Sequence, residues 1–231
     1  MRIEVWGVEG IGEVRAGDDV AQTIADAIAK HKDGLANGDV VVVTHKIISK
    51  AEGRIRPAAN EEEYRQAVED EAAEIIRRRG PLVIAQTRHG FICANAGVDR
   101  SNVEGDNVVL LPERPDRSAH QIRMRLKEVF GRDVGVVVSD TFGRPWRRGL
   151  TDVAIGCSGV VSIVDLKGTL DMQGRVLEVS EIAVIDEIAA AADLVMGKAS
   201  GVPVAVIRGL SVAGNGRAAD LVRPANEDMF R

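Results

Sequence analysis

The sequence predicts an α+β fold with mixed, largely antiparallel sheets and flanking helices. Two observations carry this prediction: helical and strand patterns are interspersed, and the strands over 91–111 lie too close together for helical crossovers. No Pro/Gly/Ser-rich linker divides the chain, so we expect residues 1–231 to form a single unit.

The first half of the chain has two helical patterns, each followed by an apolar strand. Val20, Ile24 and Ile28 recur every four residues and predict a helix over 18–32 behind an Asp cap. A buried strand is expected over 39–44. Asn60 and Glu63 have the capping spacing and predict a second helix, ended by Gly80-Pro81. Strands are then expected over 82–86 and, broken by a turn at 105–107, over 91–111.

The second half repeats this alternation. Ser118 and Gln121 predict the start of a helix that stops at Gly131. Strands are expected over 134–139, 153–156 and 160–164. A helix over 180–196, ended by Gly197, leads into a strand over 204–207.

Composition argues against several classes of protein. The net charge is −5 and only seven residues are aromatic, so we expect no nucleic-acid partner. No window approaches the roughly 18 apolar residues of a membrane span, and the N-terminus lacks a signal peptide's apolar stretch, so a cytoplasmic protein is expected. Cys93 and Cys157 form no CxxC pattern and are expected to be core thiols.

Neither a Walker loop nor GxGxxG is present, and four polar segments are the candidates for chemistry. Residues 9–13 carry two glycines that suit an anion or a plain surface turn. Residues 44–54 follow a buried strand with several basic side chains, and a solvated loop is the alternative interpretation. Residues 93–102 combine Asp99 and Asn102 among small residues, a pattern that suits a hard cation or a capping turn.

The fourth segment, residues 136–149, is the most informative. Asp140 and Thr141 follow an apolar strand and are apt ligands for a nucleotide-bound divalent metal. Arg144, Arg147 and Arg148 come directly after them and can clamp carboxylate or phosphate oxygens. Surface arginines on a loop are the alternative, but charges of both signs beside an apolar strand favour a function.

Taken together, THKIISKAEGR, CANAGVDRSN, SDTFGRPWRRG with TDVAIGCSGV, and DEIAAAADLVMG followed by VPVAVIRGL resemble the coenzyme F420-0:L-glutamate ligase family in order and across nearly the whole chain. The resemblance implies a GTP-dependent ligase that adds L-glutamate to coenzyme F420-0, first by an amide bond and then by γ-linkages. It implies an acyl-phosphate intermediate, release of GDP and phosphate, and an intertwined homodimer. Some relatives continue into a nitroreductase-like domain. We expect none within residues 1–231, and a stand-alone ligase and one domain of a longer protein both stay open.

The resemblance also assigns residues. It implies divalent metal (Mn²⁺ or Mg²⁺) ligands at Asp99, Asp140 and Thr141, with K⁺ as a further candidate cation. Lys198 stands where some relatives carry an acidic residue. The GTP contacts it implies are Ile11, Gly12, Glu13, Val14, His45, Lys46, Lys50, Asn102, Met196, Gly197, Lys198, Ala199, Ser200 and Gly201.

Asp140 is expected to act in catalysis through the bound metal. Arg144, Arg147 and Arg148 are our hypothesis for holding the anionic acceptor or the incoming glutamate. Two alternatives stay open: a related ligase with another carboxylate acceptor, and a nucleotide-binding module without catalysis. Turnover that needs both acceptor and glutamate would separate a ligase from such a module.

Overall fold

The computed structural model describes residues 2–229. Its centre is a five-stranded sheet with the order β1-β12-β2-β8-β9. These strands span Glu4–Gly7 (β1), Val204–Arg208 (β12), Val40–Thr44 (β2), Gly135–Arg144 (β8) and Arg147–Ser158 (β9). The β2–β8 pair is parallel and the other pairs are antiparallel, which confirms an α+β fold with largely antiparallel pairing.

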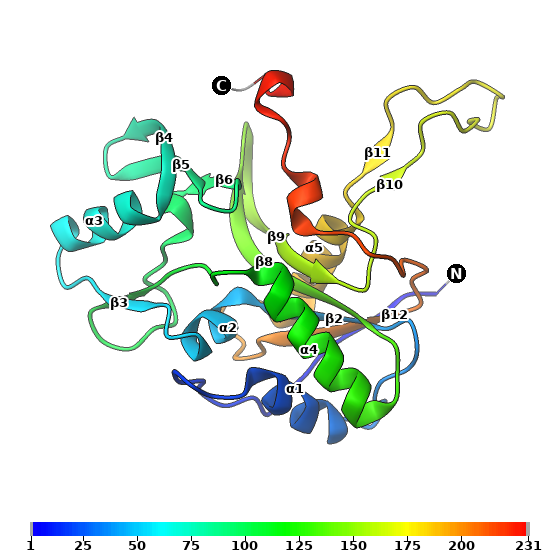
Figure 1. The fold of residues 1–231 in the computed structure, drawn as a ribbon, viewed down its shortest axis with the longest axis horizontal. Helices are drawn as coiled ribbons and strands as arrows, with labels where there is room; N and C mark the ends of the chain where they lie inside the picture. The colour runs from blue at the N-terminus through cyan, green and yellow to red at the C-terminus, as the bar shows by residue number, and fades with distance from the viewer. Residues whose placement is uncertain (1, 230–231) are drawn as a thin grey trace.

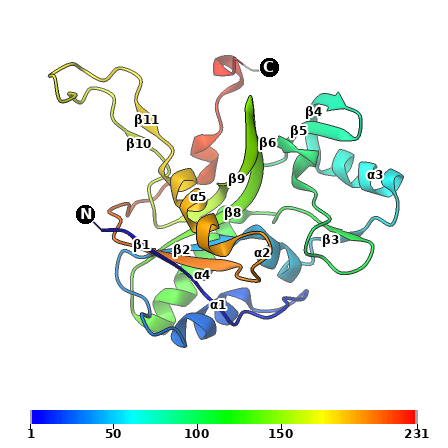
Figure 2. The same cartoon turned by 180° about the vertical axis from the view of Figure 1, so that it is seen from behind.

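Helices cover both faces of this sheet, as Figures 1 and 2 show from opposite sides. One face carries α1 (Val20–Ala29) and α4 (Pro115–Phe130), and the other carries α5 (Val184–Met196). The four valines of β2 are therefore buried on both sides, which explains their uninterrupted apolar run.

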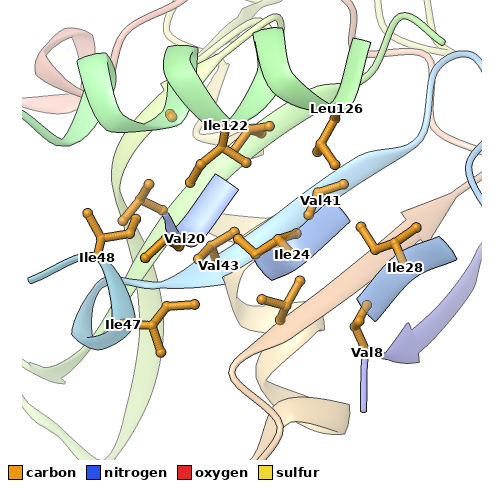
Figure 3. Close-up of a cluster of buried hydrophobic side chains, with 14 of the residues drawn as sticks. Val8, Val20, Ile24, Ile28, Val41, Val43, Ile47, Ile48, Ile122 and Leu126 are labelled. Atoms are coloured by element: carbon orange, nitrogen blue, oxygen red, sulfur yellow. The ribbon is translucent and has the colours of Figure 1, made fainter. Parts of the chain in front are cut away.

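The larger core lies between the sheet and α1, α2 (His45–Ala51) and α4 (Figure 3). Ile24 and Ile28 on α1 meet Ile122 and Leu126 on α4, over Val41 and Val43 of β2. Ile47 and Ile48 extend the cluster into α2. This packing fixes α2 at the end of β2, where the chain turns directly from strand into helix.

A smaller layer lies beside the main sheet around its own apolar cluster. It contains α3 (Glu61–Glu71), a sheet with the order β4-β5-β6, and the β3–β7 pair. The strands are Ala72–Arg79 (β4), Leu82–Thr87 (β5), Ile92–Ala94 (β6), Ile55–Pro57 (β3) and Asn107–Val109 (β7), with a short 3₁₀ helix at Asn95–Gly97.

Two hairpins project from this body (Figures 1 and 2). The end of the β8–β9 pair forms one, and β10 (Val164–Asp165) with β11 (Glu181–Ile182) forms the base of the other. The C-terminal segment adds short 3₁₀ helices at Ala218–Leu221 and Ala225–Glu227. No helix within residues 2–229 is both long and apolar enough to cross a bilayer.

Most expected elements are confirmed, and four are corrected. The helix capped by Asn60 ends at Glu71, and residues 72–79 form β4, because their backbone pairs with β5 across the turn at Gly80. α4 begins at Pro115 rather than Ser118, since proline is tolerated at the first helical position. Residues 180–183 precede α5 and include β11. Of the strand expected over 160–164, only a bridge at Val160 and the start of β10 form.

Candidate functional site

A cavity of about 540 Å³ opens at the edge of the main sheet where β2 ends and its pairing with β8 stops. β1, β2 and β8 run in the same direction. β1 and β2 end at this edge, where α/β sheets commonly bind ligands, while β8 passes it at Asp140 and Thr141 and continues to Arg144. Fourteen of the residues expected from the sequence line it: Ile11, Gly12, Glu13, Val14, Lys46, Lys50, Asn102, Asp140, Thr141, Met196, Gly197, Lys198, Ala199 and Gly201.

The helix α2 supplies the cavity's two central lysines. Lys46 and Lys50 are four residues apart and therefore lie on the same side of the helix, while Ile47 and Ile48 pack into the core. Lys46 Nζ lies 2.7 Å from Asp99 Oδ2 and 2.6 Å from Ser101 Oγ.

Lys50 is only 7% exposed and pairs with Glu13. Burial of a lysine is costly unless the ammonium has a partner. The carboxylate of Asp99 therefore holds Lys46 in place, and that of Glu13 holds Lys50. Together they give the cavity wall two fixed ammonium groups.

Strands β8 and β9 supply the carboxylates. Asp140 Oδ1 accepts a hydrogen bond from the backbone N–H of Thr141 at 2.7 Å and lies 3.2 Å from His45 Nε2. Asp152 is the cross-strand partner of Thr141 and accepts hydrogen bonds from the hydroxyls of Ser139 and Thr141, both at 2.7 Å.

Burial raises the pKa of Asp152, and these two hydroxyl donors offset only part of that effect. The negative charges of Asp193 and Asp140 raise its pKa further. A positive charge bound beside these three carboxylates would therefore relieve an electrostatic cost that the fold already carries.

Two glycine-containing segments complete the walls: residues 11–14 after β1, and residues 196–203 after α5. Gly197 and Gly201 have φ values of 54° and 72°, a backbone conformation that other residues adopt at a cost. A ligand can approach the backbone closely at Gly12 and Gly201, where a Cβ would meet no other atom within 4 Å, whereas the N–H of Gly197 already donates to the carbonyl of Asp193.

Several expected residues do not line the cavity. His45 is buried behind it and Ser200 bonds back to the carbonyl of Met196. Asp99 lies behind Lys46. Burial raises the pKa of the Asp99 carboxyl, but the ammonium of Lys46 and the hydrogen bonds from Ser101 lower it more, so its pKa lies below the ordinary value.

The three arginines lie near the tip of the β8–β9 hairpin. Arg144 and Arg147 flank its turn, Arg148 follows, and all three are exposed. Arg144 Nη2 donates to the carbonyl of Arg148 at 2.7 Å. None of the three lines the cavity, so the structure separates them from Asp140 and Thr141, with which the sequence analysis grouped them.

Sequence reasoning missed part of the lining. Asp152 carried no diagnostic pattern, and Asp193 lies within a helix whose acidic residues look like an exposed face. The signal for Asp152 was the near-symmetric spacing around Pro145-Trp146, because a hairpin there pairs it with Thr141. The other missed lining residues are Thr44, Ile47, Val103, Glu104, Val202 and Pro203.

The side chains of this cavity suit a phosphate-bearing ligand and a hard cation. Lys46, Lys50 and Lys198 can meet phosphate oxygens, and the carboxylates offer oxygen ligands. Within residues 2–229, however, no three His, Cys, Asp or Glu side chains are grouped closely enough to hold a metal by themselves.

Comparison with known proteins identifies close relatives. A family model described as F420-0:gamma-glutamyl ligase matches residues 10–209. The chain is 43% identical over 251 positions to a Methanothermobacter thermautotrophicus protein named coenzyme F420:L-glutamate ligase, with both chains fully covered. Proteins of the same name from Methanocaldococcus jannaschii and Archaeoglobus fulgidus are 38% and 41% identical, and the match covers this whole chain and 97% of each relative. The family match includes every segment that lines the cavity.

Proposed function

Because this chain belongs to the F420-0:gamma-glutamyl ligase family, we propose that it joins L-glutamate to coenzyme F420-0, with GTP as the energy source. Family membership confirms the resemblance expected from the sequence. The observation that carries the proposal is the cavity: it gathers lysines, carboxylates and glycine-rich backbone from segments far apart in a chain that its relatives match end to end.

The reaction we propose has two steps. A carboxylate is a poor acyl donor, so an oxygen of the acceptor's carboxylate first attacks the γ-phosphorus of GTP and displaces GDP, which forms an acyl phosphate. The amine of glutamate then attacks the acyl carbon, phosphate leaves, and the nitrogen loses a proton. The first glutamate is joined by an amide bond. For each later glutamate, the γ-carboxylate of the glutamate already attached is phosphorylated by GTP, and the amine of the incoming glutamate then displaces phosphate.

The chain's own residues support the first step electrostatically. Lys46 and Lys50 face the cavity and would neutralise phosphate oxygens, which is the main contribution that proteins make to phosphoryl transfer. The backbone of residues 11–14 and 196–201 and the side chain of Asn102 would hold the nucleotide. Lys198, which also lines the cavity, would add a third ammonium group.

The oxygen donors fit Mg²⁺ or Mn²⁺. Proteins commonly hold such ions through one or two carboxylates, with substrate phosphates completing the coordination. Asp140, Asp152 and Thr141 present such oxygens on one wall, and a bound cation would offset charge on the phosphate oxygens. Asp99 would join them only if Lys46 moved off its carboxylate.

For the exposed arginines, we propose a role outside the phosphoryl-transfer cavity, holding anionic groups of the acceptor or the incoming glutamate along the hairpin. Arg147→Ala should then raise KM for one of these substrates and leave KM for GTP unchanged. Arg132→Ala, an exposed arginine away from the hairpin, is the control. Unchanged KM values for acceptor and glutamate would contradict this assignment.

We also propose a homodimer formed through the projecting hairpins. The β10–β11 hairpin carries Leu170, Met172, Val176 and Val179, which are 57% to 101% exposed, and clustered exposed apolar side chains commonly mark interfaces. Light scattering should give twice the chain mass, and Met172→Glu with Val179→Glu should give the mass of one chain. A monomeric wild type would contradict the proposal.

The ligase is tested by mass spectrometry of F420-0 after incubation with the protein, GTP, Mn²⁺ and L-glutamate. Products heavier by one or more glutamyl units are expected with the wild type and with Asp26→Asn, an exposed carboxylate on α1, but not with Asp140→Asn. An unchanged acceptor alongside GTP turnover with another carboxylate would indicate a related ligase. Nucleotide binding without turnover would indicate a binding module.

A further inference from the structure

The side chain of His45 lies behind the cavity, between Ser49 of α2 and Asp140 of β8. Its side chain is 1% exposed and does not line the cavity. It is the first residue of α2, one position before Lys46. Because the imidazole of His45 is buried next to the cavity-lining Lys46 but cannot touch a ligand itself, any role in binding must act through a neighbouring residue.

Both ring nitrogens of His45 face polar partners. Nδ1 lies 3.2 Å from the hydroxyl oxygen of Ser49, which is 0% exposed and one turn further along α2. Nε2 lies 3.2 Å from Asp140 Oδ1. A chain of polar contacts thus runs from the inner side of α2, through the imidazole, to a carboxylate on the cavity wall.

Nε2 of His45 is fully buried and makes no well-aligned hydrogen bond within residues 2–229. A buried donor without a partner is costly, so a small rotation that aligns Nε2–H with Asp140 is favourable. The contact with Ser49 is compatible with this arrangement: when the hydroxyl donates to Nδ1, the ring proton is on Nε2 and faces Asp140.

The two contacts of Asp140 fall on the same oxygen. Oδ1 receives the backbone N–H of Thr141 and faces His45 Nε2, whereas Oδ2 has no protein partner among the described residues. A carboxylate fixed through one oxygen presents the other in a defined direction, and hydrogen bonds of this kind orient groups that bind metals.

We propose that His45 is a positioning residue: with Ser49 behind it, it fixes Asp140 through Oδ1 so that Oδ2 is presented to a divalent cation in the cavity. This inference rests on the metal-binding part of the proposed function. Ser49 is too deeply buried to meet a substrate, so the Ser–His–Asp order does not describe a hydrolase triad.

The same helix therefore serves the cavity twice. Lys46 and Lys50 form one pair spaced by four residues and line the cavity. His45 and Ser49 form a second pair with that spacing and lie behind the cavity wall.

The test measures Mn²⁺ binding by electron paramagnetic resonance, with GDP present, in parallel with thermal unfolding. His45→Ala should weaken Mn²⁺ binding about 10- to 100-fold. His45→Gln, which keeps an N–H donor at a similar distance, should recover most of that loss. Ser49→Ala should have a smaller effect, and adding it to His45→Ala should weaken binding no further. His120→Gln, which alters another histidine beside a serine, should bind as the wild type does.

Wild-type Mn²⁺ affinity in His45→Ala would overturn the inference. Equal losses in His45→Ala and His45→Gln, tracking equal losses of thermal stability, would overturn it too, because they would show a purely structural role. If the wild type and Asp140→Asn bound Mn²⁺ equally, both the inference and the proposed metal role of Asp140 would fail. Ligation measured by mass spectrometry would still report on the ligase proposal separately.

Discussion

Replacing Ile48 by alanine tests whether core packing sets the position of the lysines on α2. Ile48 is 3% exposed and packs in the larger core. The change removes three carbon atoms, which at about 0.8 kcal/mol each amounts to about 2.4 kcal/mol of lost burial. The remaining cavity adds to this, so we expect the free energy of unfolding to fall by about 3–4 kcal/mol, inside the range of about 2–5 kcal/mol known for such changes.

The same substitution should also weaken nucleotide binding, because α2 loses an anchor beside Lys46 and Lys50. Ile24→Ala is the matched control: Ile24 is 0% exposed in the same core, but α1 contributes no side chain to the cavity. Ile48→Val should cost about 0.5–1.5 kcal/mol and have a smaller effect on binding.

Urea denaturation followed by circular dichroism gives the unfolding free energies of these variants. Calorimetric titration with GTP gives the affinities at a temperature where every variant is fully folded. Equal loss of GTP affinity in Ile24→Ala and Ile48→Ala would refute the reasoning, since stability alone would then explain the effect. A cost under about 1 kcal/mol for Ile48→Ala would refute the packing argument.

Three further predictions follow from particular contacts. Burial raises the pKa of the thiols of Cys93 and Cys157 to about 12 each, so at pH 8 only about one thiol in 10⁴ is ionised. Both should resist a thiol reagent in the folded protein, with a rate that still rises tenfold per pH unit between pH 9 and 11. A rate that levels off near pH 9 would contradict this. Gly156→Ala should lower the free energy of unfolding by about 1–3 kcal/mol, because the added Cβ would lie 2.5 Å from the backbone of Pro115 in α4. Urea denaturation measures this change. An unchanged urea midpoint would contradict the prediction and show that α4 shifts to make room. Arg208→Met should cost about 3–5 kcal/mol, because Arg208 forms two hydrogen bonds with the buried carboxylate of Asp39. The double variant Arg208→Met with Asp39→Asn should recover part of the lost free energy of unfolding, because it removes the unpaired charge. If the losses of the two single variants simply added up in the double variant, an unpaired charge would not be the cause.

Local sequence signals predicted the elements whose pattern and packing agree. The apolar face of α1, behind its Asp cap, was visible in the spacing of Val20, Ile24 and Ile28. The valine run of β2 reflected burial on both faces. Each polar segment that local chemistry singled out supplies at least one residue to the cavity: β1 and β2 end at one edge of the sheet, and β8 passes the same edge at Asp140 and Thr141. Residues 196–201 were implied only by the family resemblance.

The missed features depend on contacts between distant residues. Nothing local breaks the helical pattern after Glu71, and β4 forms because the β-branched Ile75 and Ile76 join a strand that pairs with β5. Asp152 enters the cavity through its pairing with Thr141 across a hairpin. The arginines that follow Asp140 in sequence are carried away from it because β8 continues as an extended strand to Arg144.

The cavity draws its walls from residues 11 to 203, so it exists only when nearly the whole chain has folded. A ligand that occupies it binds the native state alone and shifts the folding equilibrium by mass action, by about 2.7 kcal/mol at a concentration 100 times its dissociation constant. In a cell, nucleotide supply would then set how long the protein survives proteases. At low nucleotide concentration the protein would spend more time open to degradation, and its abundance would follow the availability of the nucleotide that we propose it uses.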